Sequence, residues 1–503
     1  MPKELPEDVE ELKRLLRIIA TERNDFYERL QLLEHRYKTE MRNKYGRKSE
    51  TFDPSQLLLF AQQELAAEAR TDLEPEKTAE RKDKAIEKEV KPRGHGRRRP
   101  MELSRIPVII DVPESEKVCQ RCTSERKCFG RSVTLQLDYE PGRAFYWEYV
   151  RLKYACSYCE SSLKVAKPPE QPIQRGMPAA GMLAHIVTSK YADHLPLHRL
   201  EGIFSRQGLV LNRSTMCDWV QSVTKMMTPV FDQMMHEIKK SKVIWTDDTP
   251  VRVLDRELKK RTKTGRIWVY RGDDEHPYIA FRFTNSRERA GPLEHLENFR
   301  GFLQADAFAG YDAIFVGGGV TEVACLAHAR RKFVDAMNSS QSAAAEILLL
   351  IQKLYDMERT CKDSSDAERL NARQEFSVPL LAELKDTLDR HALVSVPKSP
   401  LAKAIQYTRN QWSALQTFTT CGDLTIDNNL AENALRPIAV GRKNWMFAGS
   451  ESGGHAIAVM SSIISTCRRL ELDPFAYLKA AITKITEEPN CPAEQLLPGR
   501  LTL

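Results

Sequence analysis

The stretch KVIWTDDTPVRVL, residues 242–254, decides the fold, because it combines a run of apolar residues with two adjacent acids. Its β-branched and aromatic residues predict a β-strand. Two further strands are predicted directly after it, within GRIWVYRG (265–272) and PYIAFRFT (277–284). A helix and two more apolar strands are expected next: RERAGPLEHLENF (287–299), GFLQADAFAGY (301–311) and TEVACLAHARRKF (321–333).

Three strands in a meander, a helix and two strands joined by crossovers are the order of the ribonuclease H fold. In that fold, carboxylates from the first strand, the fourth strand and a later helix meet at one edge of the sheet. The corresponding acids are Asp247, Asp306 and Glu432, the last within TIDNNLAENALRPIAVGRKNW (425–445). For any one of them, the alternative is a solvated acid at the end of a strand or helix.

A shared metal site would explain why acids follow apolar strands, since burial of an unpaired charge is costly. Three carboxylates can hold two Mg²⁺ ions about 3.5–4 Å apart, and Mg²⁺ prefers oxygen ligands. Asp248 is the alternative to Asp247. Neighbouring strand residues point to opposite faces, so we expect only one of the two to be a ligand, and we favour Asp247.

The residues around Glu432 predict a helix with one polar face. Asn429, Glu432, Asn433 and Arg436 are spaced i, i+3, i+4 and i+7, which places them on the same side. Glu432 would face the metal ions. We expect Asn429 and Arg436 to contact DNA phosphates beside it.

The ends of this helix are predicted from Asp427, a good N-cap residue, and from Pro437, which we expect to stop it. Arg442, Lys443 and Trp445 would then lie on the following loop, as a pair of cations and a platform for stacking a base. For Trp445 the alternative is packing in the core.

HARRKF (328–333) is expected to end the fifth strand beside the acids. His328, Arg330 and Arg331 suit contacts with DNA phosphates, and an imidazole there also suits proton transfer. A structural salt bridge is the alternative for the arginines. Cys325 and His328 have no recognisable third partner, which argues against a nucleophilic thiol.

The N-terminal part predicts a helix followed by a linker. Apolar residues in 8–45 repeat in alternating steps of four and three, as in a coiled coil, with a surface helix as the alternative. Residues 64–100 are rich in charge and poor in aromatics, which predicts a linker. Its end, KPRGHGRRRP (91–100), is either a solvated linker or a basic arm lying along phosphates or in a minor groove. Of its four arginines, Arg93, Arg97 and Arg98 are the candidates for contact with DNA.

Two C-x-x-C pairs, CQRC (119–122) and CSYC (156–159), predict a tetrahedral zinc site. The sequence between them alternates apolar and polar residues, as a β-hairpin would. Four thiolates fill all the ligand places, so the zinc would be structural. The ligands are Cys119, Cys122, Cys156 and Cys159.

The next segment is predicted to be helical. PLHRLEGIFSRQG (196–208) begins with Pro and ends with Gly, and LNRSTMCDWVQSV (211–223) follows it. This is the pattern of a helix-turn-helix, whose second helix would turn Arg213, Thr215 and Gln221 toward DNA. A helical hairpin without DNA contacts is the alternative.

Length and composition agree with a nucleic-acid partner but do not identify one. The chain has 503 residues, too many for one ordinary domain, and a net charge of +7. No apolar run approaches the roughly 20 residues of a membrane helix, and the N-terminus lacks the apolar region of a signal peptide. We therefore expect a cytoplasmic protein, whose eleven cysteines are thiols or metal ligands rather than disulfides.

Together these patterns predict a multidomain α+β protein. In chain order its parts are a coiled-coil helix with short helices (1–63), a charged linker with a basic arm (64–104), a four-cysteine zinc-binding β-hairpin segment (105–170), a helical helix-turn-helix domain (171–240), the first part of a ribonuclease H-like α/β catalytic core (241–339), an all-helical insertion (340–424), and the last part of the core with the Glu432 helix and C-terminal helices (425–503).

Four motifs resemble the transposases of the insertion sequence 66 family: WTDDTPVRVL, LQADAFAGYD, CLAHARRKF and IDNNLAENALRPIAVGRKNWMFAGSESGG. Upstream, CQRC with YACSYC, AHIVTSKYADHLPLHRLEGIF and YGRKSE are similar to the zinc-binding, helical and coiled-coil segments of that family. The resemblance covers nearly the whole chain. One motif departs from it: the family usually has Asp-Glu-Thr-Pro where this chain has Asp-Asp-Thr-Pro, so Asp248 stays a candidate helper.

The resemblance implies a DDE triad, which falls on Asp247, Asp306 and Glu432. It also implies strand cleavage and strand transfer at terminal inverted repeats, dependent on two Mg²⁺ ions that Mn²⁺ could replace. The implied partners are double-stranded DNA, as element ends and target, and two small companion proteins. Because two ends must be paired, we expect a homodimer or larger complex in the bacterial cytoplasm, associated with the nucleoid.

Two other functions fit the same residues. One is a catalytically inactive, zinc-containing DNA-binding protein that represses its own gene. The other is a nuclease of the same fold without strand transfer. The three intact acids argue against the first, and the large N-terminal DNA-binding region argues against the second.

Replacing Cys119 with Ser is expected to impair folding and DNA binding, because a zinc site that lacks one thiolate holds its metal poorly. Atomic absorption measures the zinc content, and circular dichroism measures the loss of structure. Cys128→Ser, at a thiol outside the two pairs, is the control. Full zinc occupancy in the Cys119→Ser protein would contradict the four-cysteine site.

Overall fold

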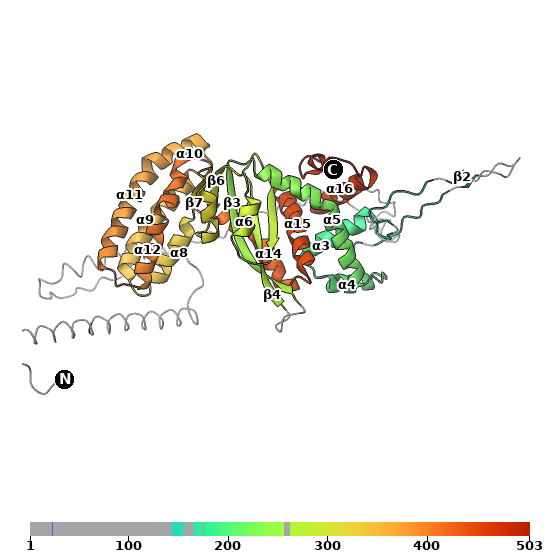
Figure 1. Ribbon diagram of the computed structural model, residues 1–503, viewed down its shortest axis with the longest axis horizontal. Helices are drawn as coiled ribbons and strands as arrows, with labels where there is room; N and C mark the ends of the chain where they lie inside the picture. The colour runs from blue at the N-terminus through green and yellow to red at the C-terminus, as the bar shows by residue number, and fades with distance from the viewer. Residues whose placement is uncertain are drawn as a thin grey trace, which may run out of the picture. The chain divides into compact units, whose positions relative to one another are not determined.

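The computed structural model describes residues 176–255 and 262–502, together with Arg23, Gly142 and short pieces between 144 and 174 (Figure 1). The predicted coiled-coil helix, the basic arm and the four zinc-ligand cysteines lie outside the described residues. The described chain from Ala144 onward belongs to one unit. No helix in this described part has both the length and the apolar character required to cross a membrane.

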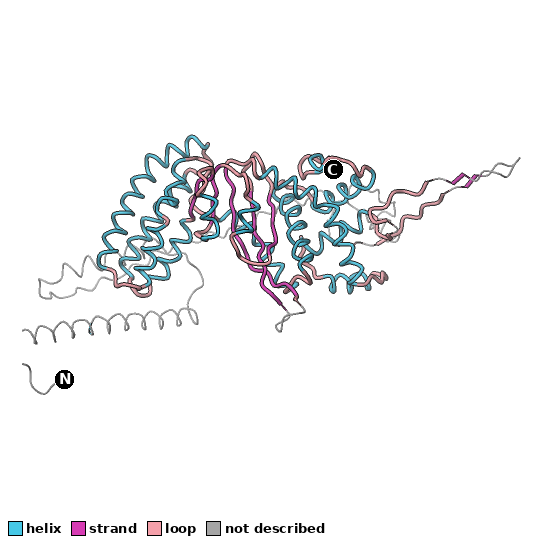
Figure 2. The backbone as a smooth tube through the Cα atoms, viewed as in Figure 1, coloured by secondary structure: helices cyan, strands magenta, loops and turns pink. Residues whose placement is uncertain are grey.

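A five-stranded mixed sheet forms the centre of this unit, with strand order β5-β4-β3-β6-β7 (Figure 2). Its first three strands form an antiparallel meander, and the last two lie parallel on the other side of β3. This confirms the predicted order of strands. Their bounds are β3 Val243–Leu254, β4 Thr262–Arg271, β5 Ile279–Thr284, β6 Gly301–Ala305 and β7 Val320–Ala324.

Strand β3 continues well past the point where its parallel neighbour stops. It pairs with β6 only over Val243–Trp245, whereas its pairing with β4 extends to Leu254. Asp247 was expected at the end of its strand, but it lies within β3. It is level with the point just beyond the end of the neighbouring strand β6. The sheet is open on that side of β3, which leaves room for a site there.

The fifth predicted strand is shorter than expected. It ends at Ala324, and helix α8, Leu326–Ala336, begins after Cys325. His328, Arg330 and Arg331 are therefore on a helix, and their placement at the end of a strand was wrong. The reason is that Leu326, Ala329 and Phe333, which α8 buries, recur at helical spacing.

From residue 176 to the sheet, where the chain is described without a gap, there are three helices: α3 Ala180–Tyr191, α4 Leu197–Arg206 and α5 Arg213–Ile238. As predicted, α4 begins after Pro196 and ends before Gly208, whose φ of 80° suits glycine. Helix α5 runs much further than the expected second helix of a helix-turn-helix, because its C-terminal half packs in the core.

The three residues predicted to face DNA lie in the first part of α5. Arg213 is exposed, and Thr215 and Gln221 are half-buried. Met216 and Trp219, on the other side of the same turns, are buried. The face of the helix is thus as predicted, while its contact with DNA stays a prediction.

The β-hairpin predicted between the cysteine pairs agrees with the described residues only in part. Strand β1, Lys153–Tyr154, pairs with β2, Lys164–Val165, which lies beyond the second pair of cysteines. Residues 144–151 form no strand. The expected partner strand, near residue 135, lies outside the described residues.

The segment expected to be an all-helical insertion contains no strand between Ser340 and Leu424. It starts with α9, which packs on α8, and α12 packs there as well. The elements are α9 Gln341–Thr360, α10 Asp366–Ala372, the π-helical turn η3 Arg373–Ser377, α11 Val378–Val394, α12 Pro400–Asn410, α13 Trp412–Gln416 and the 3-10 turn η4 Thr417–Thr420.

A buried arginine ties the end of this insertion to its first helix. Arg373 pairs with Glu358 of α9, with Nη2 2.6 Å from the carboxylate, and its side chain is 1% exposed. It also donates to the backbone carbonyls of Phe418, Cys421 and Leu424. The insertion therefore returns to the sheet along a fixed path.

The remaining elements pack on the sheet or on the helices beside it. Helix α14 packs on β3 and β4, and α15 packs on β5. Their bounds are α6 Ala290–His295, η2 Ala309–Tyr311, α7 Asp312–Phe315, α14 Asn429–Trp445, α15 Glu451–Arg469, α16 Pro474–Glu487 and η5 Ala493–Leu496.

Helix α15 covers the edge strand β5 with its hydroxyl groups. Phe281 N–H donates to Ser462 Oγ at 2.7 Å, and Ile279 N–H donates to Thr466 Oγ1 at 2.9 Å. Residues four apart on a helix and two apart on a strand have similar spacing, so two hydroxyls match two strand amides. Edge amides that would otherwise lack partners are thereby satisfied.

Replacing Ser462 with Ala should lower the free energy of unfolding by about 1–3 kcal/mol, because the buried Phe281 amide loses its acceptor. Chemical denaturation monitored by circular dichroism measures the change. Ser222→Ala is the matched control, since that hydroxyl makes a similar bond to its own helix at an exposed position. Equal effects of the two substitutions would contradict a specific role at the strand edge.

Candidate active site

Asp247 lies on β3 where the sheet opens, and it is mostly buried. The Asp248 amide donates to its Oδ1 at 2.7 Å. Burial, together with the charges of Asp306, Asp248 and Glu432, raises the pKa of Asp247 to about 7. The acids predicted from three separate stretches of sequence are therefore close enough to interact electrostatically.

Asp306 directly follows β6, and 23% of its side chain is exposed. Burial raises its pKa, while the guanidinium of Arg287 opposes that shift. Arg287 Nη2 is 3.5 Å from Asp306 Oδ2, and its guanidinium lies over the Phe308 ring, 4.1 Å from the centroid. The second acid thus has one cationic partner from the loop after β5.

Glu432 projects from the first turn of α14 and is one-third exposed. Its Oε1 lies 4.0 Å from His328 Nε2 on α8. Because this glutamate comes after the whole insertion, its position depends on how the returning chain attaches to the sheet.

That attachment is made by a buried glutamine in β6. Gln304 Nε2 donates to the carbonyls of Thr425 and Asp427 at 2.6 and 3.0 Å, and its Oε1 accepts from the Thr425 hydroxyl at 2.9 Å. Trp245 Nε1 also donates to that hydroxyl, at 3.0 Å. Asn428 Nδ2 donates to the carbonyl of Thr246 at 2.8 Å. The start of α14 is therefore hydrogen-bonded to both β3 and β6.

Asp427 binds the backbone amide of Asn429, the first residue of α14. Its Oδ1 accepts from the Asn429 N–H at 3.1 Å, and its Oδ2 accepts from the Asn429 side chain at 2.7 Å. Burial raises its pKa. Asp427 thus satisfies a free amide of α14, as predicted, although Asn428 is the residue at the N-cap position.

Asp248 differs from Asp247 in its partners. Arg266 Nη1 lies 2.8 Å from its Oδ2, Arg287 Nη2 lies 2.8 Å from its Oδ1, and only 2% of the side chain is exposed. A carboxylate held by two arginines has little capacity left for a metal ion. The geometry therefore separates the two adjacent acids into different environments.

Cys325, His328 and Glu432 form a second group, with potential ligand atoms within 4.8 Å of one another. Cys325 Sγ accepts from the Asn428 N–H at 3.2 Å, and burial raises the pKa of the thiol to about 11. A protonated, buried thiol agrees with the argument against nucleophilic cysteine. His328 Nδ1 is buried and has no hydrogen-bond partner among the described residues.

The exposed face of α14 is the one predicted. Asn429, Asn433 and Arg436 are exposed beside the half-buried Glu432, and Ala434 on the other side is buried. This face places amide and guanidinium groups next to a candidate metal-binding acid.

The prediction that Pro437 ends this helix was wrong, because α14 continues to Trp445 with the proline inside it. A proline within a helix loses one hydrogen bond and costs about 3 kcal/mol. Burial of Ile438 and of the face that continues through Gly441 offsets that cost. Lys443 and its neighbours are therefore on a helix and not on a loop.

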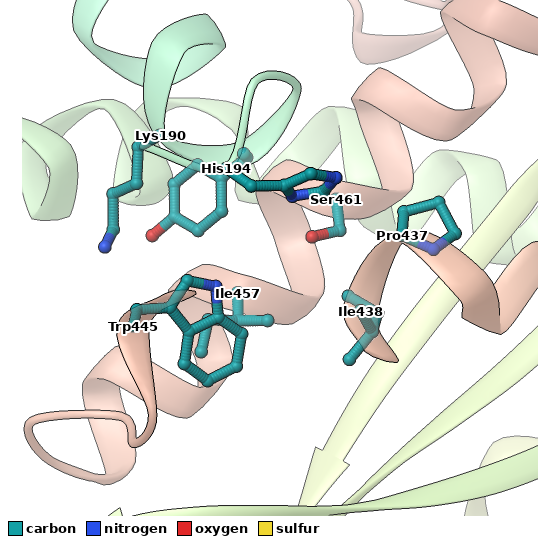
Figure 3. Close-up of a pocket in the computed structure, with 8 residues that line it drawn as sticks. Lys190, His194, Pro437, Ile438, Trp445, Ile457 and Ser461 are labelled. Atoms are coloured by element: carbon teal, nitrogen blue, oxygen red, sulfur yellow. The ribbon is translucent and has the colours of Figure 1, made fainter. Parts of the chain in front are cut away.

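Two of those neighbours have partners inside the protein. Arg442 Nη1 donates to Thr249 Oγ1 at 2.7 Å and to the Pro250 carbonyl at 2.8 Å, both on β3. Trp445 lines a small pocket with His194 (Figure 3). A Cβ at Gly441 would lie 2.8 Å from the indole nitrogen, so the ring packs against its own helix. Lys443 is exposed.

Some site residues were not found from the sequence. Gln304 carried a signal, since a polar residue within the apolar run GFLQA requires buried partners. Arg287 carried none, because it lies in a loop whose path only the structure gives. Asn428 was overlooked beside the stronger capping residue Asp427.

A five-stranded mixed sheet, with acids on its first strand, after its fourth strand and on a helix that returns from an insertion, is consistent with the ribonuclease H-like core of a DDE-type phosphoryl-transfer enzyme. The family model "Transposase IS66 family" matches residues 175–456, and "Transposase C of IS166 homeodomain" matches residues 32–108. The chain belongs to the IS66 family of transposases, and its activity is DNA transposition.

Three curated proteins of Sinorhizobium fredii strain NGR234 are similar over most of their length. Uncharacterized protein y4jD is 34% identical over 400 residues, which are 77% of this chain and 78% of that protein. Uncharacterized proteins y4hP and y4qI are each 31% identical, over 79% of this chain and 75% of their own length.

A DDE domain implies divalent metal ions. The carboxylates of Asp247, Asp306 and Glu432 are the oxygen donors that Mg²⁺ prefers. The raised pKa of Asp247 also fits, because a buried acid among other acids lacks a cation when no metal is bound. Asp247, Asp306 and Glu432 therefore suit the divalent metal ions that the family implies.

Replacing Asp247 with Asn should stabilise the metal-free protein at neutral pH. Folding raises the pKa of Asp247 from 3.8 to about 7. The contribution of this acid to the free energy of unfolding is therefore fully present below pH 3.8, and it is lost as the pH rises through 7. The variant escapes this loss, which is on the order of 2–4 kcal/mol. Thermal melting in a chelator across this pH range measures the difference, which should shrink toward acid pH.

The exposed acid Asp335 provides the control, as Asp335→Asn. Adding Mg²⁺ should stabilise the wild type more than Asp247→Asn, since only the wild type keeps the full ligand charge. A wild type as stable as Asp247→Asn in chelator at neutral pH would contradict the buried, unpaired acid.

Proposed function

We propose that this transposase binds the terminal inverted repeats of its element and catalyses strand cleavage and strand transfer through Asp247, Asp306 and Glu432. The observation that supports the proposal is the raised pKa of Asp247 on β3, to which the charges of Asp306 after β6 and Glu432 on α14 contribute from distant parts of the chain. An acid whose pKa is raised by burial and by neighbouring acids is typical of a functional site, where a bound cation would stabilise its charged form.

The reaction consists of two in-line phosphoryl transfers. In the first, water attacks the phosphodiester at the element end and the 3′-oxygen leaves with a proton. In the second, that 3′-hydroxyl loses its proton and attacks a phosphodiester of the target, whose own 3′-oxygen leaves with a proton. Bound Mg²⁺ ions, or Mn²⁺ in their place, supply activation of the attacking oxygen and stabilisation of the leaving oxygen.

The chain's own residues have distinct parts in this proposal. Asp247, Asp306 and Glu432 would hold two metal ions. His328, whose Nε2 lies 4.0 Å from Glu432 Oε1, would receive the proton of the attacking group. Asp248 is assigned to holding Arg266 and Arg287, because both oxygens of its buried carboxylate are already engaged.

We assign the DNA contacts nearest the acids to the exposed face of α14 and to α8. Their amides and cations suit phosphate oxygens. Arg442 and Trp445 also belong to the proposed interface, although their internal partners give them a structural part. The residues are Asn429, Arg436, Arg442, Lys443 and Trp445 on α14, and His328, Arg330 and Arg331 on α8.

End recognition is assigned to the N-terminal half of the protein. Arg213, Thr215 and Gln221 of α5 would read the repeat, and the arm at 91–100 would follow its backbone. A structural Zn²⁺ on the four cysteines would support this region. Pairing of two ends calls for a homodimer or larger assembly, with the two companion proteins as further partners, acting on the nucleoid in the cytoplasm.

Replacing Glu432 with Gln is expected to abolish cleavage and leave DNA binding nearly unchanged, because it removes one charge from the metal ligands and keeps the shape of the side chain. A Mg²⁺-dependent assay on labelled DNA with the element's ends measures both products. Asp335→Asn, which changes an exposed acid of α8, is the matched control.

Cleaved and joined products from the wild type and from Asp335→Asn, with none from Glu432→Gln, would support the triad. Normal cleavage by Glu432→Gln would exclude Glu432 as a ligand. Binding without product in every protein, including mixtures with the companion proteins, would instead favour an inactive DNA-binding protein.

A further inference from the structure

The C-terminal end of α14 presents two exposed apolar side chains that the proposed chemistry does not use. Met446 is 65% exposed and Phe447 is 40% exposed. Met446 has φ 58° and ψ −40°, and Phe447 N–H donates to the Trp445 carbonyl at 2.7 Å. This is a γ-turn in its rarer, strained form. We call Met446 and Phe447 the apolar corner.

The apolar corner is held on both sides. Before it, Trp445 packs against Gly441 and His194, and Met446 N–H donates to the Arg442 carbonyl at 3.0 Å. After it, Ala448 N–H donates to the Arg252 carbonyl, and Leu254 N–H donates to the Ala448 carbonyl, each at 2.8 Å. A strained turn that its surroundings hold in place, with apolar side chains exposed, points to a functional role.

The surroundings of the apolar corner are cationic. Arg436 and Lys443 on α14 and Arg252 on β3 are exposed, and none of the three forms an ion pair within the part of the chain that the structure describes. Two acids close by in sequence, Asp255 and Glu451, are both paired with Lys263, which offsets part of their charge. An anionic partner with an apolar interior matches this surface better than a protein does.

Two elements give the distance from the apolar corner to the acids. Fourteen residues of helix separate Glu432 from Met446, about 21 Å at 1.5 Å per residue. Along β3, Asp247 lies six residues before Val253, which bridges to Ala448, and this is about 20 Å. A duplex rises 3.4 Å per base pair, so about six base pairs span the same length.

We infer that the apolar corner is a wedge that inserts between base pairs of duplex DNA lying along α14, about six base pairs from the phosphate that is cleaved at the acids. Phe and Met are among the side chains that unstack bases in this way, and flanking cations hold the bent backbone. The inference rests on the proposed function. It adds that the DNA bound along α14 is bent and locally unstacked by the apolar corner.

The test uses the full-length protein and duplexes carrying a terminal repeat, each with 2-aminopurine at one position. Without divalent metal, wild-type protein should cause a several-fold rise in fluorescence only near the sixth base pair from the cleavage site. The double variant Met446→Ala, Phe447→Ala should lose this rise and still bind. Leu393→Ala, which shortens an exposed apolar side chain of α11, is the matched control.

Thermal melting checks that the variants fold, and Met446→Ala alone should already weaken the signal. Mg²⁺-dependent cleavage is measured on the same duplexes. Cleavage by the wild type without any local rise in fluorescence, or an undiminished rise with the double variant, would overturn the wedge and leave the proposed function standing. Neither binding nor cleavage by the wild type with its companion proteins would overturn both.

Discussion

The position of the third acid depends on one buried side chain, Gln304. All its hydrogen-bonding capacity is used on the returning chain, with two bonds donated to the carbonyls of Thr425 and Asp427 and two accepted from the amide and hydroxyl of Thr425. A buried amide satisfied in this way fixes one register, because a shift by one residue would leave polar groups without partners. Glu432 is thereby placed beside the sheet although the whole helical insertion precedes it.

The site itself is arranged at a cost to stability. Asp247 is buried among other acids, and the arginines nearby are directed elsewhere: Arg266 to Asp248, and Arg287 to Asp248 with a longer contact to Asp306. The chain thus neutralises one acid of the adjacent pair and leaves the other without a cation. Sites built for a ligand commonly show this imbalance, because the ligand completes the charges.

Much of this arrangement could be predicted from sequence, because apolar runs followed by acids are governed by burial, which the residues themselves determine. The predictions that were wrong concern elements whose structure depends on tertiary packing. The run before His328 was short enough to be read as strand, and packing carried α14 past Pro437 against its local preference. Arg287 could not be found, since a loop residue gains its role only from what it meets in space. Gln304 was visible in the sequence but was not used.

The hydroxyls that cover β5 also limit how copies of this protein can associate. Sheets commonly extend across subunits by pairing their edge strands, and that requires free amides and carbonyls. On β5 those groups are engaged by Ser462 and Thr466, and the opposite edge strand, β7, is contacted by α13 and η4. Strand β5 of this core is therefore closed to an intermolecular sheet, and contacts between copies of the core are expected at other surfaces.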